Sequence, residues 1–151
     1  MKRFAFTMIE LIFVLIILGV LAAVAIPRLA ATRDDAQDAM MAQNIMRGVG
    51  EIASYAVVKG ETNESLSVMS NGIGSLVSAG KAHLDTVEKA AYIHRGSVND
   101  CIIIDINSSS TDENLSLSYG DAGGDSLCLE LQSLVDISRY PMQIRGAVVE
   151  H

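Results

Sequence analysis

Basic side chains are scarce in this chain of 151 residues: 11 Lys and Arg stand against 18 Asp and Glu, which gives a net charge of −7 at pH 7. Lys2 and Arg3 account for two of them, so the remainder carries nine basic against 18 acidic residues, a net charge of −9. A surface with this charge repels phosphate backbones. The charge balance therefore argues against nucleic acid as a partner.

Residue patterns that mark enzymes and metal sites are also missing. His83, His94 and His151 are scattered, and none shares a short metal-ligand spacing with another His, Cys or carboxylate, so zinc is not expected. The serines lack the context of a nucleophile elbow. Cys101 and Cys128 are too far apart for a CxxC redox or metal motif. We therefore expect no catalytic residue, no metal ligand and no cofactor.

Charged residues make up 19% of the chain against a usual ~25%, while apolar residues make up 50%. One segment explains most of this bias, since Leu11 to Ile26 contains no polar side chain. Phe6 to Ile26 would span about 31 Å as a helix, which matches a hydrocarbon core of ~30 Å. Because Lys2 and Arg3 precede it, the positive-inside rule places the N-terminus in the cytoplasm and the rest across the membrane.

Three interpretations of this segment compete. A cleaved secretory signal also has a basic start, and "LAAVA" offers a small-x-small cleavage site, but its apolar core is usually about 7 to 15 residues. A plain single-pass anchor explains the length and the orientation but gives no reason for Glu10, the one ionisable residue within the run. The Glu10 carboxylate either reaches the cytoplasmic headgroups or binds a cationic partner within the membrane.

The third interpretation is a family resemblance. The stretch "FTMIELI" (Phe6–Ile12), which follows a short basic leader and precedes an apolar run ending in Ala25-Ile26-Pro27, resembles the type III signal of type IV pilins and type II secretion pseudopilins. The resemblance is strong from Met1 to Arg28 and concerns only general organisation beyond it. It implies that a prepilin peptidase cuts between Ala5 and Phe6 and that Phe6 is then N-methylated. The family's usual residue before the cut is Gly, so Ala5 is a departure.

The same resemblance implies a role for Glu10. Cleavage would create an α-amine with a pKa of about 7.7 to 8, which is largely cationic at neutral pH, and methylation keeps the charge. Glu10 lies four residues along on the same helix face, and opposite charges attract strongly at low dielectric constant. The family implies that Glu10 meets the amine of a neighbouring subunit; a pair within one chain is the alternative. Thr7, Gly19 and Pro27 complete the expected assembly residues.

The helical pattern continues beyond Pro27, which lacks an N–H and is expected to kink the helix rather than end it. Gly60 is the expected stop, so we predict one long helix to about Lys59. The apolar positions that recur at helical spacing are Leu29, Ala36, Met40, Ile45, Val49, Ile52 and Ala56.

Weaker patterns follow. We predict a broken helix over Leu66–Ala79, interrupted at 71–74, and a short helix over Lys81–Ala91. Strands are predicted at Cys101–Ile106, Leu115–Tyr119, Leu127–Leu131 and Met142–Val149, with turns at 107–114 and 120–125. The predicted class is α+β and pilin-like: a long N-terminal helix, transmembrane in its first half and kinked at Pro27, packs on a small antiparallel sheet. Residues 1–5 form the leader, 6–27 the transmembrane and assembly helix, and 28–151 the periplasmic head with the second half of the helix.

Both cysteines are expected in the periplasm, where disulfides form. Cys101 and Cys128 each lie in a strand-like segment, and neighbouring antiparallel strands bring opposite Cα atoms to about 4.5 to 5.5 Å, within reach of a disulfide. We predict that bond, with two buried free thiols as the alternative. The acidic turn at 120–125 could hold calcium, as in some pseudopilins, but it lacks EF-hand spacing and better fits a solvated turn.

The predicted function is that of a structural subunit, without catalysis, in a type II secretion pseudopilus or a related type IV filament. Expected partners are other copies of the chain, other pilin-like subunits, prepilin peptidase, an inner-membrane assembly platform and membrane lipid. The chain is expected to cross the inner membrane once, with its head in the periplasm and its filament there or at the cell surface. The alternatives are a type IV pilin of an extracellular pilus for motility or adhesion, and a membrane-anchored periplasmic binding module that does not polymerise.

Overall fold

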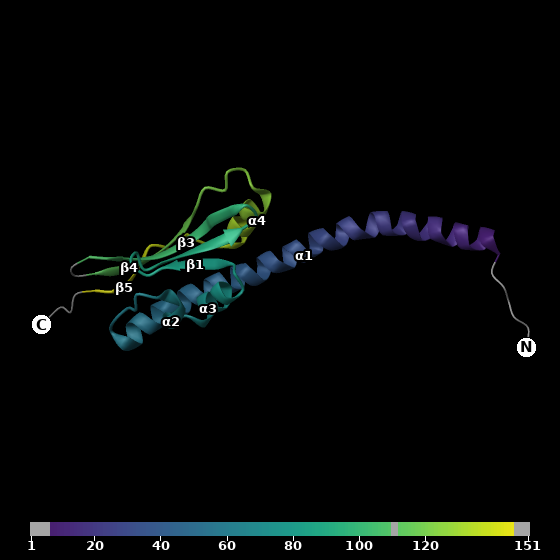
Figure 1. Cartoon of the computed structure of the whole chain (residues 1–151). Coiled ribbons are helices and arrows are strands. Elements are labelled where there is room, and N and C mark those ends of the chain that lie inside the picture. The colour runs from purple at the N-terminus through teal and green to yellow at the C-terminus, as the bar shows by residue number, and fades with distance from the viewer. Residues whose placement is uncertain (1–6, 110–111, 147–151) are drawn as a thin grey trace, which may run out of the picture. The chain divides into compact units, whose positions relative to one another are not determined.

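The computed structural model describes residues 7–109 and 112–146, so the expected processing site at Ala5 and Phe6 lies outside the described residues. The chain divides into two compact units, Met1–Gln37 and Asp38–His151, and helix α1 (Met8–Lys59) contributes to both. The further elements in chain order (Figure 1) are α2 (Leu66–Met69), α3 (Asn71–Ser78), β1 (Ala82–Asp85), β2 (Ala90–Arg95), β3 (Val98–Ser108), β4 (Glu113–Tyr119), α4 (Ser126–Leu134) and β5 (Met142–Arg145).

Helix α1 ends where the sequence predicts. Gly60 follows its last residue with a φ of +69°, a conformation that glycine adopts without steric cost, and the Gly60 N–H still donates to the Ala56 carbonyl at 2.9 Å. The helix continues through Pro27, and the kink there stays a prediction.

The buried face of α1 differs in part from the predicted one. Met40 is exposed, and so is Leu29. The stripe that contacts the core instead begins at Asp38 and Met41 and repeats every three or four residues. Its later members, Ile45, Val49, Ile52 and Ala56, are buried as predicted.

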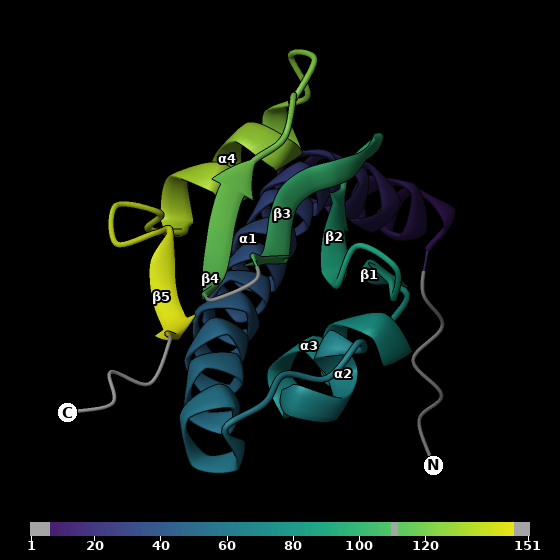
Figure 2. The ribbon, with the colours of Figure 1, turned by 90° about the vertical axis from the view of Figure 1, so that its left-hand side faces the viewer.

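The five strands form one antiparallel sheet in the order β1-β2-β3-β4-β5, so each strand pairs with its neighbours in sequence. Figure 2 shows this order, with the second half of α1 behind the sheet. Alternate residues of the central strands face α1 and close the core, while the residues between them lie on the opposite face. The core-facing residues of β2, β3 and β4 are Ala91, Ile93, Ile102, Ile104, Ile106, Leu115 and Leu117.

The helix predicted over Lys81–Ala91 is wrong, because β1, a turn and the start of β2 occupy this segment. The Asp85 carboxylate accepts hydrogen bonds from the N–H groups of Val87 and Glu88, at 2.8 and 3.0 Å. An Asp side chain that binds the backbone just after it in this way stabilises a turn in competition with a helix.

The strand predicted over Leu127–Leu131 is also wrong, because this stretch lies in α4. Asp125 caps the helix by accepting hydrogen bonds from the N–H groups of Leu127 and Cys128, at 3.0 and 3.1 Å. The two buried residues of α4, Cys128 and Leu131, are three apart, which is a helical spacing. Alternation over only five residues cannot distinguish a strand from a helix of this kind. β5 lies within its predicted range and ends at Arg145.

The helix predicted over Leu66–Ala79 is present as two helices, α2 and α3, but the interruption predicted at 71–74 is wrong, because these residues form the first turn of α3. The break lies at Ser70, which is extended and whose hydroxyl oxygen caps α3 by accepting from the Ile73 N–H at 3.1 Å.

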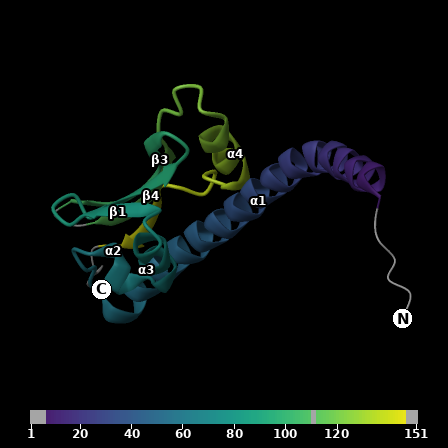
Figure 3. The same ribbon diagram turned by 45° about the vertical axis from the view of Figure 1, so that its right-hand side comes forward.

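Helices α2 and α3 lie beside the second half of α1 (Figure 3). A Cβ on Gly72 would lie 2.6 Å from the Asn44 carbonyl oxygen and 3.1 Å from the Gly48 Cα, so only glycine permits this close approach of α3 to α1.

Candidate functional site

Large apolar side chains cover α1 from Met8 to Leu29 without a polar stripe. Fifteen of them expose between 42% and 80% of their surface within this chain. A helix that is apolar all round requires an apolar environment, either a membrane or the interior of a larger assembly. Among the described residues, α1 is the one helix that is long and apolar enough to cross a membrane.

Thr7 and Glu10 form a capping box at the start of this helix. The Glu10 Oε2 atom accepts hydrogen bonds from the Thr7 N–H at 2.9 Å and from the Thr7 hydroxyl at 2.8 Å, and the Glu10 N–H contacts the Thr7 hydroxyl oxygen at 3.3 Å. The spacing is Thr-x-x-Glu, a recognised signal for a helix start, which the sequence analysis overlooked. The carboxylate also lies at the positive end of the helix dipole.

The other two expected assembly residues, Gly19 and Pro27, lie apart from this capping box. Both are inside α1, eight residues from each other. A Cβ on Gly19 would meet no atom within 4 Å, so nothing within the described part of the chain requires glycine there.

A buried ion pair joins α1 to the sheet. Arg95, at the end of β2, contacts both carboxylate oxygens of Asp38, with Nε 2.5 Å from Oδ1 and Nη2 2.9 Å from Oδ2. The Asp38 side chain is 0% exposed and the Arg95 side chain 6%. Neither residue was among the expected site residues. The available signal was a carboxylate in register with the buried stripe of α1.

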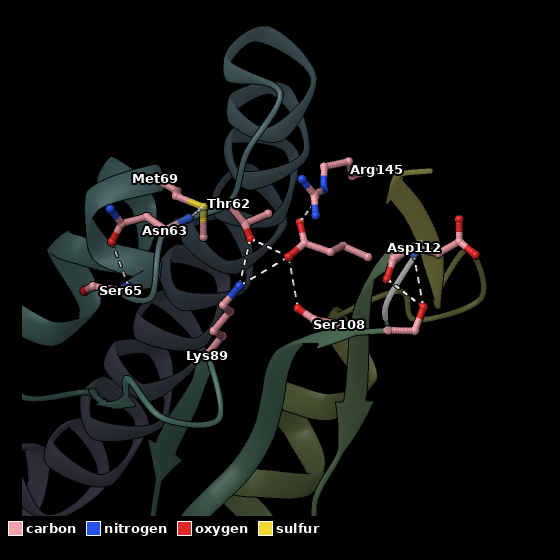
Figure 4. Close-up of polar contacts among 10 residues, drawn as sticks. Thr62, Asn63, Ser65, Met69, Lys89, Ser108, Asp112 and Arg145 are labelled. Carbon is pink, nitrogen blue, oxygen red and sulfur yellow. Dashed lines mark hydrogen bonds and ion pairs between the residues drawn. The ribbon is translucent and has the colours of Figure 1, made fainter. Parts of the chain in front are cut away.

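Glu113, at the start of β4, contacts residues from four segments of the chain, and Figure 4 labels these partners as Thr62, Lys89, Ser108 and Arg145. Its Oε1 accepts hydrogen bonds from Thr62 at 2.8 Å, Ser108 at 3.0 Å and Lys89 at 3.2 Å, while Arg145 Nε lies 3.1 Å from Oε2. Burial alone would raise the pKa of Glu113, but these hydrogen bonds and the Lys89 charge outweigh it and lower the pKa. The ionised Glu113 carboxylate therefore links these four segments within the fold.

Cys101 and Cys128 are joined by a disulfide, with their Cα atoms 5.7 Å apart. The bond links β3 to α4. The predicted bond is present, but the prediction that it joins two neighbouring strands is wrong, because Cys128 lies on helix α4. The bond crosses 27 residues of sequence and fixes α4 against the sheet.

Asp125 uses both carboxylate oxygens within the fold. Oδ1 caps α4, and Oδ2 accepts hydrogen bonds from the Ser97 N–H at 2.9 Å and the Ser97 hydroxyl at 2.8 Å. The Ser97 N–H contributes most, followed by the Ser97 hydroxyl and the N–H groups of α4, and together they lower the pKa of Asp125 to about 2. These contacts favour a structural role for the 120–125 turn over calcium binding.

Two histidines that are eleven residues apart in sequence lie together on the sheet. His83 Nδ1, on β1, lies 3.1 Å from His94 Nε2, on β2. The Tyr92 ring stacks on His83 with the centroids 4.8 Å apart, and its hydroxyl donates to the Glu88 carboxylate at 2.6 Å. That hydrogen bond, followed by burial and nearby carboxylates, raises the pKa of Tyr92 to about 12. Within residues 7–109 and 112–146, no group of three or more His, Cys, Asp or Glu is arranged to hold a metal ion.

Comparison of the chain with protein-family models, with curated proteins and with solved structures found no match. The candidate site is therefore inferred from the residues of this chain alone. It consists of an apolar helix surface from Met8 to Leu29, with a capped carboxylate at its start.

Proposed function

We propose that the chain is a filament subunit that is anchored in a membrane by the first half of α1 and assembles through it. The observation that carries the proposal is the all-round exposure of the fifteen large apolar side chains from Met8 to Leu29. Burial of one such side chain stabilises a structure by about 1.5 to 3 kcal/mol relative to water. A surface of this size therefore favours transfer into lipid and then into a bundle of like helices.

Specific assembly requires more than apolar contact, because lipid tails solvate apolar side chains as well as another helix does. Glu10 meets this need. Both Thr7 donors share Oε2, so within the described residues the lone pairs of Oε1 stay open to another donor. A cationic α-amine from a neighbouring copy fits that position. The capping box would hold the carboxylate ready for docking.

The resemblance of "FTMIELI" to prepilin signals supports this function and supplies its processing step. A pseudopilus of a type II secretion system is the filament we propose first, with an extracellular type IV pilus as the variant that shares the signal. The folded unit from Asp38 onward would then face the periplasm and form the filament surface.

Mass spectrometry of the mature N-terminus tests the proposal. We expect a chain that begins at N-methylated Phe6 and lacks Met1 to Ala5. A terminus after Ala23 or Ala25 would mean a secreted protein, and an unprocessed chain would favour the membrane-anchored binding module. A secretion assay beside a surface-pilus assay in a deletion strain then separates the pseudopilus from the pilus.

A further inference from the structure

The pair formed by His83 and His94 lies on the sheet face opposite α1. His83 is directly across from Tyr92 in the β1–β2 register, and His94 follows Tyr92 by two residues, which places all three side chains on one face. The residues that alternate with them, Ala91 and Ile93, point into the core. We propose that His83 and His94 form a binding site for a late first-row transition-metal dication such as Zn²⁺ or Cu²⁺.

The separation of the two nitrogens fits a shared ion. Metal–imidazole bonds of about 2.0 to 2.1 Å place two ligand nitrogens about 2.9 Å apart at a 90° angle and about 3.3 Å apart at a tetrahedral angle. The observed distance between His83 Nδ1 and His94 Nε2 is 3.1 Å, between these two values. The rings are inclined by 34°, with their centroids 4.9 Å apart, so a single ion beside the pair can reach both nitrogens.

The proton between the rings can make way for the ion. In the neutral pair, one facing nitrogen carries the proton and donates it to the other. When the ion binds both facing nitrogens, this proton leaves to solvent and the outer nitrogen of the same ring takes one up. The exchange therefore releases no net proton, and both facing nitrogens are free to bind the ion.

The surroundings hold the two ligands in place before binding. Four residue pairs join β1 to β2, and the His94 N–H donates to the Lys81 carbonyl at 2.8 Å. Tyr92 stacks against His83 and is itself fixed by Glu88. His83 is exposed, so water can fill the remaining coordination positions. With two protein ligands, the ion is a surface ligand of the folded sheet and is not needed for folding.

The test uses the full chain in detergent micelles, without a polyhistidine tag, and Zn²⁺ alone in a non-coordinating buffer. We expect one saturable site, with shifts of the His83 and His94 imidazole signals in NMR spectra. Loss of an outer-shell partner of a metal ligand weakens binding about 10- to 100-fold, so His83→Gln and His94→Gln should each weaken Zn²⁺ binding at least tenfold. His151→Gln, which removes the third histidine of the chain, is the matched control and should bind like the unaltered chain.

Cu²⁺ supplies a measurement that needs no variant. Its paramagnetism should broaden the amide signals of β1 and β2 around the pair before any others. The proposal is overturned if the unaltered chain shows no saturable binding, if both glutamine variants bind as tightly as it does, or if Cu²⁺ broadens another region first.

Discussion

The two halves of α1 are one helix with opposite surfaces. From Met8 to Leu29 the helix is apolar on every side and exposed. From Asp38 to Ala56 it buries one stripe, in which Ile45, Val49 and Ile52 are 0% exposed, and presents polar residues elsewhere. The second half completes its burial within its own chain. The first half does not do so within the described residues, and the proposed function uses this exposed surface for anchoring and assembly.

Each half also carries a carboxylate among apolar residues. Asp38 has a guanidinium from the same chain as its partner, 2.5 Å away and buried with it. Glu10 has only the two donors of Thr7 among the described residues. The difference suggests that the charge of Asp38 serves folding, whereas the charge of Glu10 serves assembly.

Substitution of Glu10 should give the largest effect on filament assembly. In Glu10→Val, the incoming subunit would lose its proposed charged contact, so we expect an about 10- to 100-fold loss of assembly. Filament yield, measured in a sheared or cross-linked fraction, should fall accordingly. Membrane insertion should be unchanged or slightly better, because a charge is removed from the apolar run.

Glu10→Asp is the control, since it keeps the charge and shortens its reach. It should retain part of the yield, while hydrogen exchange in the sheet stays as in the unaltered chain for both variants. A normal filament yield from Glu10→Val would contradict the division of roles between the two carboxylates.

Substitution of Asp38 should act in the opposite way. Asp38→Ala removes the buried carboxylate that contacts Arg95, and removal of one partner of a buried ion pair typically costs about 3 to 5 kcal/mol. Hydrogen exchange of the amides of Ile102 and Ile104, which lie in the centre of the sheet, should report this loss of stability in the full chain.

The double variant Asp38→Leu, Arg95→Met sharpens this test. It removes both charges and keeps apolar volume, so we expect stability to recover toward that of the unaltered chain. If Asp38→Ala were as stable as the unaltered chain, the ion pair would not be the link between α1 and β2.

The smallest expected effect is a loss of stability of the second unit, Asp38–His151, at acidic pH. The pKa of Asp125 is lowered from 3.8 to about 2 by the Ser97 and α4 donors, so its contribution to stability is complete above about pH 3.8 and is lost as the pH falls toward 2. Asp125→Asn keeps a capping side chain without the charge and should show a flatter decline between pH 4 and 2. Near-ultraviolet circular dichroism of the tyrosines would follow it. An identical decline in both proteins would contradict the assignment.

Much of the fold could be predicted from local patterns. The helix to Lys59, its stop at Gly60 and the core strands β3 and β4 all follow from spacing or turn chemistry. The two segments whose type of secondary structure was predicted wrongly lie where the pattern is short. Periodicity cannot distinguish helix from strand in segments as short as Lys81–Ala91 and Leu127–Leu131. Hydrogen bonds from nearby N–H groups to Asp85 and Asp125 favour the turn in the first segment and the helix in the second.

The candidate site divides in the same way. The sequence alone determined the apolar helix, because an unbroken run of apolar side chains is a local property, and it placed Thr7 and Glu10 at its start. Only the tertiary structure decided that Asp38 meets Arg95, 57 residues away, that His83 meets His94, and that Cys128 reaches Cys101 from a helix. These contacts join elements through the packing of the sheet, and no spacing along the chain records which side chains that packing brings together.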